Sequence, residues 1–448
     1  MIRSHRSVYT SSRSNGFVML SCGLAASAAL GQSTVPAVFV ANNGNLVGAV
    51  TSLGFDSNRY PVILDSLLIQ ERPSGSPSVP GTNAYEISLS TDGKYLAVTH
   101  ATAATVTEQL TIIRVNPDAT MEIAGIFQVP DSPLDVVWLG DRRLAVIQSD
   151  LSLPNDVGIY DLDDSGPTLT LTERDREVTG GFCTYLFAHP TLDVLYTQDS
   201  NEPRKVEPWS IASNGTLTSL GASFTSPAYS LEIVVSPNGR WAYSTGGISN
   251  GGHSINGFSV DSSGALTPAA STPTQSPGNS PADIAISPDS QFVICGHGSD
   301  ATARTFAIGT NGELTYTGTT FDVGTQGTLG DIQTMMVDGF PTVLISDNST
   351  LDSNWGIYAF TLGSQGELIS NGPILPLGYQ QANAMATWEV DSTCYADCDH
   401  SGTLNIFDYI CFGNAYSAND PYADCDGNQL FNVFDYICFG NEYSAGCP

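Results

Sequence analysis

The feature that most constrains the fold is a strand–turn–strand pattern that recurs about every fifty residues along the chain. Six copies lie at residues 86–100, 135–149, 185–199, 232–246, 283–297 and 334–348. A second hairpin, with Thr and Leu alternating after a polar turn, lies at residues 161–171, 211–220, 260–269, 308–317 and 362–370. Two hairpins in each period make a four-stranded antiparallel unit, which is the blade of a β-propeller.

A seventh blade can be assembled from segments that lie far apart in the sequence. Residues 382–390 would supply its inner strand, and residues 35–43 and 62–70 would supply others. Joining strands from both ends of the chain removes the exposed sheet edge that an open array would leave. We therefore predict an all-β, seven-bladed propeller over residues 32–390. Two β-sandwiches are the alternative, but they explain the constant period less well.

Two of the repeats resemble a known family. The segments SPNGRWAYSTGG (236–247) and SPDSQFVICGHG (287–298), each followed by a second turn, are similar to the lactonase family of seven-bladed propellers, which includes 6-phosphogluconolactonase-like proteins. The resemblance implies that, if the chain is an enzyme, it hydrolyses lactones. It also implies an Arg-His pair at one inner-strand start and an Asn-Glu pair at the end of the next strand. Residues 230–232 and 244–247 carry neither pair, and we expect no His and Arg together on this rim.

Acidic residues instead recur at the predicted starts of the inner strands. Four of them stand five positions before the turn: Glu86, Asp135, Glu232 and Asp283. The ends of the second strands carry four more polar candidates: His100, Asp199, His297 and Asp347. We expect the acids to surround one channel mouth and to bind a cation, a polyol or a carbohydrate there. In the alternative interpretation, each acid accepts hydrogen bonds from the backbone of a neighbouring blade.

The C-terminal segment contains a tight duplication. Residues 395–414 and 422–441 agree at fourteen of twenty positions with a constant offset of 27. Oxygen ligands recur at the spacing of a calcium loop, with helices expected over residues 407–416 and 434–443. The first loop would use Asp397, Asp399, Ser401, the Thr403 carbonyl, Asn405 and Asp408. The second would use Asp424, Asp426, Asn428, the Leu430 carbonyl, Asn432 and Asp435. The duplication therefore predicts two calcium sites.

Asp at the twelfth loop position, and no helix before either loop, make residues 391–448 resemble a Cys-rich dockerin-like module rather than a full EF-hand. The resemblance implies docking to a cohesin-like or cell-surface protein. The implied contact residues are Ile406, Phe407, Val433 and Phe434; alternatively, these side chains build the core of the module. A stability clasp or sorting signal without such a partner is a further interpretation. Ser401 and Gln429 depart from the usual loop pattern, so we expect one site to be weaker.

Six cysteines crowd the last 55 residues: Cys394, Cys398, Cys411, Cys425, Cys438 and Cys447. Such crowding predicts a disulfide framework in an oxidising compartment. The middle four follow the offset of 27, whereas Cys394 and Cys447 flank the module and are expected to pair as a clasp. Six cysteines allow fifteen connectivities, and the sequence does not choose among them.

The N-terminal residues 1–31 read as a signal peptide, because three arginines precede an apolar run from residue 16 to residue 30. No other stretch could cross a bilayer. The formal net charge of −30 argues against nucleic acid as a partner. We therefore expect a secreted or cell-surface binding propeller, attached to an extracellular assembly by its calcium-dependent tail. The alternative is a secreted lactone or sugar-acid hydrolase with the same tail.

Overall fold

The computed structural model of the chain describes most residues from 35 onward. The described ranges are 35–44, 47–71, 79–100, 109–130, 132–149, 155–179, 183–199, 205–221, 224–225, 232–246, 253–269, 272–324, 329–348, 355–379, 381–389, 395–396, 398, 404–418, 421–425 and 430–445. The predicted signal peptide lies outside them. Among the described residues, no helix is both long and apolar enough to span a membrane.

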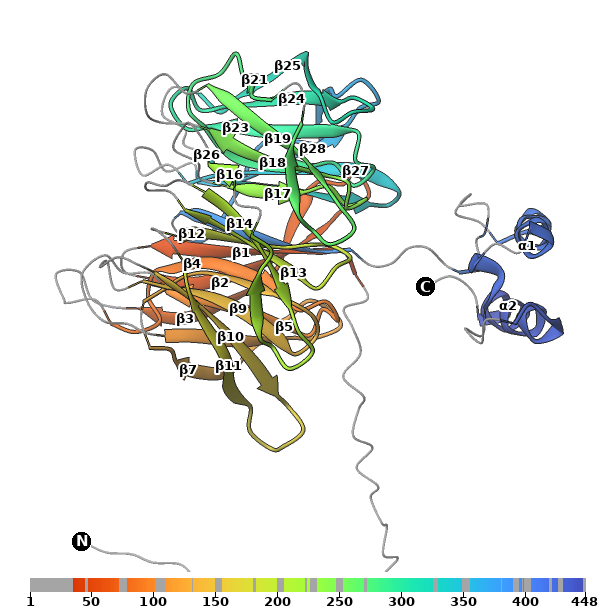
Figure 1. Cartoon of the computed structure of the whole chain (residues 1–448), viewed down its shortest axis with the longest axis horizontal. Helices are drawn as coiled ribbons and strands as arrows, with labels where there is room; N and C mark the ends of the chain where they lie inside the picture. The colour runs from red at the N-terminus through yellow and green to blue at the C-terminus, as the bar shows by residue number, and fades with distance from the viewer. Residues whose placement is uncertain are drawn as a thin grey trace, which may run out of the picture. The chain divides into compact units, whose positions relative to one another are not determined.

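Seven antiparallel sheets form the seven blades of a propeller, which confirms the predicted fold class. Figure 1 shows successive blades beside one another. From the inner strand outward, blade 1 contains β31 (Ala382–Trp388), β1 (Ala37–Gly44), β2 (Val47–Phe55) and β3 (Pro61–Glu71). Blade 2 contains β4 (Ala84–Leu89), β5 (Tyr95–His100), β6 (Gln109–Val115) and β7 (Met121–Gln128). Blade 3 contains β8 (Ser132–Trp138), β9 (Arg143–Ser149), β10 (Asp156–Asp163) and β11 (Thr170–Val178).

The outer strand is divided into two short pieces in three of the remaining blades. Blade 4 contains β12 (Cys183–Ala188), β13 (Val194–Asp199), β14 (Lys205–Ile211), β15 (Leu217–Ser219) and β16 (Phe224–Thr225). Blade 5 contains β17 (Ile233–Val235), β18 (Trp241–Gly246), β19 (Ser254–Val260), β20 (Leu266–Pro268) and β21 (Thr274–Gln275). Blade 6 contains β22 (Pro281–Ile286), β23 (Phe292–His297), β24 (Thr302–Ile308) and β25 (Leu314–Asp322). Blade 7 contains β26 (Leu329–Val337), β27 (Phe340–Asp347), β28 (Gly356–Leu362), β29 (Leu368–Ser370) and β30 (Leu375–Pro376).

The ring closes in blade 1, where strands from both ends of the propeller pair. β31 and β1 run antiparallel, with Ala37 opposite Trp388 and Val40 opposite Met385. The inner strand was expected here, and so were β1 and β3. The strand β2 was missed, because its sequence VGAVTSLGF contains Gly, Ser and Thr and lacks a clear alternation of apolar and polar residues.

The hydrophobic core is divided into layers between neighbouring blades. The layer between blades 1 and 2, for example, contains Phe39 and Val50 from the first and Leu96 and Ile113 from the second. The layer between blades 7 and 1 contains Leu344 and Val38, so apolar packing crosses the closure as it crosses every other blade junction. This packing holds the starts of the inner strands around the axis of the ring.

The C-terminal module contains two helices, as predicted, and is described by itself. α1 (Ile406–Ala418) and α2 (Val433–Ala445) are joined through the short 3-10 helix η1 (Pro421–Ala423). Phe412 and Phe439, which are 27 residues apart, are both fully buried, and their rings stack with centroids 4.2 Å apart. The duplicated sequence therefore folds with matching residues facing each other in one small core.

Candidate functional site

The starts of the inner strands surround a cavity of 170 Å³. Five carboxylates line it: Glu86, Asp135, Glu232, Asp283 and Asp331. Four of them were predicted from the sequence, and the structure brings them together. Asp331 was missed. Tyr185, Gln333 and Asn383 also line the cavity.

A local irregularity at the start of the inner strand positions four of these acids, all except Glu232. In blade 2, Ala84 pairs with His100 and the regular ladder resumes only at Ile87, so that Glu86 lies in the interruption. Asp283 and Asp331 occupy the same place in blades 6 and 7, between the paired residues of each ladder. Such bulges turn a side chain away from its regular direction. The sequence therefore directs the acids toward the axis through strand geometry as well as residue type.

Three of the carboxylates accept a hydrogen bond from the next blade. The backbone N–H of Leu186 donates to Asp135 Oδ2 at 2.6 Å, and that of Ile284 donates to Glu232 Oε2 at 2.7 Å. The N–H of Met385 donates to Asp331 Oδ2 at 2.6 Å. These bonds match the structural alternative considered for the acids, because each one ties a blade to its neighbour.

The carboxylates of Glu86 and Asp283 differ from the other three. Among the described residues, neither has a hydrogen-bond donor; the backbone N–H of Glu86 donates to Thr99 Oγ1 at 3.0 Å, but its side chain has no such contact. Both line the cavity. The cavity therefore presents two carboxylates that no protein group satisfies within the described part of the chain.

Burial raises the pKa values of all five acids, and repulsion from neighbouring carboxylates adds to it in all except Asp331. Burial raises the pKa of Asp135 to about 7 and that of Asp331 to about 6, although backbone N–H donors counteract it in both. The pKa values of Glu86, Glu232 and Asp283 lie well above the usual range, first through burial and then through neighbouring carboxylates. Tyr185 also donates its hydroxyl to Glu232 Oε1 at 2.6 Å. The ring is thus partly protonated near neutral pH.

The four candidates at the ends of the second strands do not line this cavity. His100 donates from Nδ1 to the Thr82 carbonyl at 3.1 Å, and its Nε2 lies 2.8 Å from Thr111 Oγ1. Burial lowers the pKa of His100 to about 4, and likewise that of His297. Both imidazoles are neutral and form hydrogen bonds within the protein. Because neither lines the central cavity, they do not stand beside the acids there, as the sequence led us to expect.

Asp199 and Asp347 end their strands as buried carboxylates, with 2% and 1% exposure. Neither oxygen of Asp199 has a hydrogen-bond partner among the described residues, and burial raises its pKa to about 6. Asp199 pairs in register with Cys183, where the two innermost strands of blade 4 meet, and it does not line the central cavity.

His297 and Arg304 come together in blade 6, but neither lines the central cavity, so they are not the Arg-His pair at an inner-strand start that the lactonase resemblance implies. A Cβ added to Gly278 would lie 2.0 Å from Arg304 Nη1 and 2.3 Å from His297 Cδ2, so both side chains pack on this glycine. The sequence hid this pair because Arg304 comes from the third strand of the blade. His297 Nε2 accepts from Ser276 Oγ at 2.6 Å, and Arg304 pairs with Asp300 at 3.2 Å.

The two predicted calcium loops lie only partly within the described residues. Asp397, Asp399, Ser401, Thr403, Asp426 and Asn428 lie outside them. In the first loop, Asn405 caps α1 by accepting the Phe407 N–H at 2.8 Å, and Asp408 Oδ2 accepts the Asn405 N–H at 2.7 Å. Asn432 and Asp435 repeat these bonds in the second loop, at 2.8 and 2.7 Å. Asp424 and Leu430 are described as well.

The twelfth-position carboxylates of both loops are fully buried. Asp435 Oδ1 has no hydrogen-bond partner among the described residues, while its other oxygen caps the loop. A buried carboxylate oxygen without a donor is costly unless a ligand such as a cation satisfies it. The donor set, which consists only of oxygens, therefore fits a hard cation such as calcium.

The four predicted contact residues all lie at the N-terminal ends of the helices and are exposed. Their exposures are 65% for Ile406, 62% for Phe407, 64% for Val433 and 62% for Phe434. None of them belongs to the core of the module, so the alternative that they build it was wrong. Ile410 and Ile437, each 52% exposed, extend both patches. Each lies four residues after Ile406 or Val433, so on a helix it shares a face with that residue, and this spacing could have added it to the predicted contact residues.

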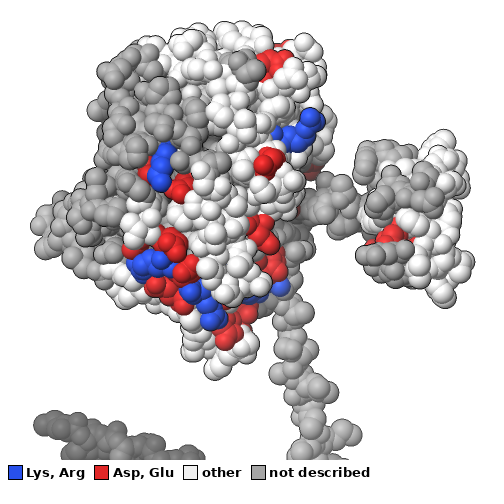
Figure 2. Space-filling view, in the orientation of Figure 1, with Lys and Arg blue, Asp and Glu red and all other residues white. Residues whose placement is uncertain are grey.

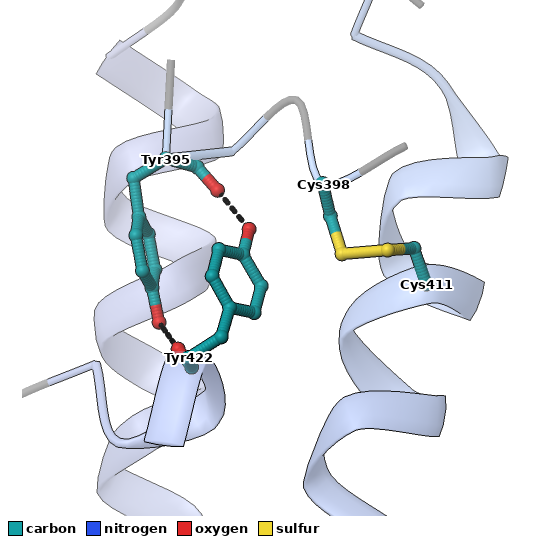
Figure 3. The surroundings of a disulfide bond; sticks show 4 residues. All are labelled: Tyr395, Cys398, Cys411 and Tyr422. Carbon is teal, nitrogen blue, oxygen red and sulfur yellow. Dashed lines mark hydrogen bonds between the residues drawn. A yellow bond between two sulfur atoms is a disulfide. The ribbon is translucent and has the colours of Figure 1, made fainter. Parts of the chain in front are cut away.

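One disulfide joins each loop to its own helix. Cys398 bonds to Cys411 and Cys425 bonds to Cys438, both with a sequence separation of 13. Cys394 and Cys447, the expected clasp, lie outside the described residues. Figure 3 shows the first disulfide beside Tyr395 and Tyr422, each of which donates its hydroxyl to the other's carbonyl.

Comparison with known proteins places the propeller. Residues 221–329 match the family described as lactonase, seven-bladed β-propeller. No curated protein matches the chain. A periplasmic gluconolactonase from Pseudomonas aeruginosa superposes with a TM-score of 0.61 at 17% identity, covering 80% of this chain and 100% of that one. A Bacteroides fragilis structure assigned as a 6-phosphogluconolactonase gives a TM-score of 0.60 at 14% identity, over 79% and 98% of the chains.

These similarities agree with the strand order and the ring closure described above. At identities below one fifth, the similarity to solved structures indicates the fold alone. The family match covers blades 5 and 6 with their flanking segments. The chain is therefore a seven-bladed β-propeller, similar to the lactonase family over residues 221–329 and followed by two small C-terminal helices.

Proposed function

We propose that the propeller is a ligand-binding module whose central cavity binds a small polyol or a terminal sugar unit. The observation that carries the proposal is the pair of carboxylates, Glu86 and Asp283, that line the cavity without a donor from the described protein. Hydroxyl groups donate to carboxylates without adding charge. At 170 Å³, the cavity has room for about five water molecules and lies below the range for drug-sized ligands, so the ligand is small.

The arrangement of the acids favours hydroxyl groups over a bare cation. Among the residues that the structure describes, no three carboxylate, imidazole or thiol groups are gathered closely enough to hold a metal ion. Calcium requires its oxygens at about 2.3–2.6 Å. The hydroxyls of a polyol, by contrast, can reach carboxylates that stand on several different blades.

Calorimetric titration of the full-length protein with erythritol, xylitol and glucose tests this proposal. Glu86→Gln and Asp283→Asn should weaken binding roughly tenfold or more, because each replaces a carboxyl oxygen that accepts from a ligand hydroxyl by an amide NH₂ group that cannot accept. The matched substitution Glu71→Gln, on an exposed residue of β3 with no side-chain partner in the described structure, should leave binding unchanged. Absence of binding by every ligand, or equal binding by all variants, would contradict the proposal.

Lactone hydrolysis is the second candidate, and the family match over residues 221–329 favours it. A carboxylate whose pKa is about 7, as for Asp135, is suited to act as a general base near neutral pH. Both of its oxygens, however, accept backbone N–H bonds, from Val136 and Leu186. Such bonds hold the carboxylate in place and leave it less available to activate water.

Hydrolysis of gluconolactone, followed at constant pH by base consumption, decides between the two functions. A binding module should show only the spontaneous rate. Turnover above that rate, lost in Glu86→Gln and retained in Glu71→Gln, would make the protein a lactonase and replace the binding proposal.

We further propose that residues 391–448 form a calcium-dependent docking module on an exported protein. The buried Asp435 Oδ1, which has no hydrogen-bond partner in the described structure, supports the proposal of a cation site in the second loop. The duplicated sequence extends this proposal to the first loop. The two exposed apolar patches at the helix starts support a protein partner of the cohesin type. Two disulfides suit an oxidising environment.

A calcium titration of the full-length protein, with its disulfides intact, tests this part. We expect two sites in the native protein, and only one after Asp435→Asn. Asp338→Asn, on an exposed turn of the propeller, should keep both. A titration without heat or stabilisation would remove the proposal, and two sites in Asp435→Asn would separate calcium binding from this carboxylate.

A further inference from the structure

A second cavity lies where blade 1 meets blade 7, away from the acidic centre. It is an open groove of 590 Å³, a size typical of sites for small organic ligands. The turn between β2 and β3 supplies one wall through Asp56, Asn58, Arg59 and Tyr60. The other wall consists of Thr361 in β28 and of residues 369–373, which lie at the end of β29 and in the segment after it.

Arg59 is unusual among the cations of this acidic protein. Most Lys and Arg side chains form ion pairs, such as Arg143 with Asp161 at 2.7 Å and Arg176 with Asp156 at 3.0 Å. On the face shown in Figure 2, most basic atoms accordingly lie next to acidic ones. Arg59, although half-buried, has no carboxylate partner among the described residues, and neither does the exposed Arg240.

The guanidinium of Arg59 is nevertheless held in a fixed position. Its Nε donates to Thr361 Oγ1 at 3.2 Å, and its Cζ lies over the Phe340 ring, 4.2 Å from the ring centre. The Asn371 side chain donates to the Arg59 carbonyl at 3.0 Å and accepts from Thr361. The two Nη groups are left without a protein acceptor in the described structure. A fixed guanidinium whose two Nη groups are both free presents one edge with two parallel N–H donors, which matches the geometry of a carboxylate.

The backbone of Arg59 is held in a conformation that the residue does not favour. Its φ is 60°, in the left-handed region, and its N–H donates to the Asp56 carbonyl at 2.8 Å. Strain of this kind persists where the surroundings fix it, and it is concentrated at functional sites. A turn that only had to reverse the chain could use glycine here at lower cost.

The remaining groups of the groove suit hydroxyl groups. Asp56 uses Oδ1 to accept the N–H groups of Asn58 and Tyr60, at 2.8 and 3.0 Å, which leaves Oδ2 as an acceptor. The Tyr60 ring packs directly on Gly372, because a Cβ there would lie 2.5 Å from Tyr60 Cδ2. Acceptor and amide groups thus stand beside a single cation and an aromatic ring.

We propose that this groove binds a sugar acid or a similar polyhydroxylated carboxylate. Arg59 takes the carboxylate through its two Nη groups, and Asp56, Asn58 and Tyr60 take the hydroxyls. The acidic centre of the ring would repel such an anion, whereas the groove offers it an unpaired cation. The inference concerns a site separate from the proposed polyol cavity and does not depend on that proposal.

Ligand-observed NMR and calorimetry on the full-length protein, with glucuronate, glucose and acetate, test the proposal. Glucuronate should bind more tightly than either of the others, and its affinity should fall as salt is added. Arg59→Met should weaken glucuronate binding roughly tenfold to a hundredfold. Arg59→Lys keeps the charge but loses the paired N–H donors of the guanidinium, so its affinity for glucuronate should lie between those of the native protein and Arg59→Met.

Arg240→Met is the matched control, since it removes the other unpaired arginine, and it should bind glucuronate like the native protein. Glu86→Gln should also leave glucuronate binding unchanged, which separates this site from the central cavity. Melting temperatures of all variants establish that they are folded. Equal affinity for glucuronate and glucose in Glu86→Gln, where the central cavity is impaired, or native affinity for glucuronate in folded Arg59→Met, would overturn the proposal.

Discussion

The five carboxylates around the axis show how one residue type can serve the fold and the site together. Asp135, Glu232 and Asp331 each accept a backbone N–H from the next blade, so their burial is compensated by a structural bond. Glu86 and Asp283 have no such compensation among the described residues. Both residues are half-buried and line the cavity, so water can hydrate their carboxyl groups, and the hydroxyl groups of a ligand can replace that water.

Because the pKa of Glu86 is raised by burial and by Asp135, its ionisation should destabilise the folded protein. The folded protein keeps this proton at pH values where the unfolded chain has lost it, so the cost grows as pH rises through the folded pKa. Glu86→Gln removes the cost. We therefore expect this variant to be more stable than the native protein by about 1 kcal/mol or more at pH 8, and by less at pH 5. Urea denaturation at both pH values measures the difference.

The comparison must be made between variants, because buried histidines act in the opposite direction. His100 and His297 have pKa values lowered to about 4, so their contribution to stability rises with pH between about 4 and 6.5. Subtracting the native protein's free energy of unfolding at each pH from that of the variant removes the contribution of the histidines. Glu71→Gln should show no pH-dependent difference. A Glu86→Gln variant that is less stable at pH 8 would contradict the assigned repulsion.

The acids also show how far single residues can be predicted. Four were found because they stand five positions before a turn. Asp331 was missed because β26 is nine residues long, against six for β4, so the acid lies two positions further from its turn. The partners of the acids are backbone groups of the next blade, about fifty residues away, and no sequence pattern encodes those contacts.

At the scale of elements, the C-terminal loops are joined to their helices by covalent bonds. Each disulfide closes a segment with a separation of 13 residues, and in the chain-entropy model a loop near this size contributes about 3 kcal/mol. A small module with few buried side chains depends on such bonds. The duplication predicted both helices correctly, whereas the pairing of the cysteines required the fold.

Replacing Cys425 and Cys438 by Ala should loosen α2 specifically. We expect hydrogen exchange in residues 433–445 to accelerate up to roughly a hundredfold, because the local opening free energy loses the contribution of the cross-link. Mass spectrometry of peptic fragments measures this exchange. The matched pair Cys398→Ala with Cys411→Ala should affect α1 more than α2. Unchanged protection of α2 would show that the aromatic core holds the helix without the disulfide.

At the scale of the whole molecule, the ring is held by one closure and seven similar interfaces. The period of the repeat predicted six blades, and the strands at the two ends of the propeller completed the prediction of the seventh. Periodicity could not reveal β2, nor the groove at the junction of blades 1 and 7, because that junction is made by segments some three hundred residues apart. Sites at a closure are therefore found only when the ring is built.

The closure predicts a sharp difference between two truncated chains. A chain that ends at residue 390 keeps β31 and should melt cooperatively, within a few degrees of the full-length protein. A chain that ends at residue 381 loses β31, which pairs with β1 and buries Ala382, Ala384 and Met385. It also loses the Met385 N–H that Asp331 accepts. We expect its melting temperature to fall by roughly 10 °C or more, as measured by calorimetry.

Adding a peptide of residues 382–390 distinguishes loss of the closure from general damage. Because the peptide supplies the missing inner strand, it should raise the melting temperature of the shorter chain and leave that of the chain ending at 390 unchanged. A peptide in which Met385 is replaced by Pro cannot donate to Asp331 and should rescue poorly. If the chain ending at 381 melts like the longer one, the seven blade interfaces hold the ring without its closing strand.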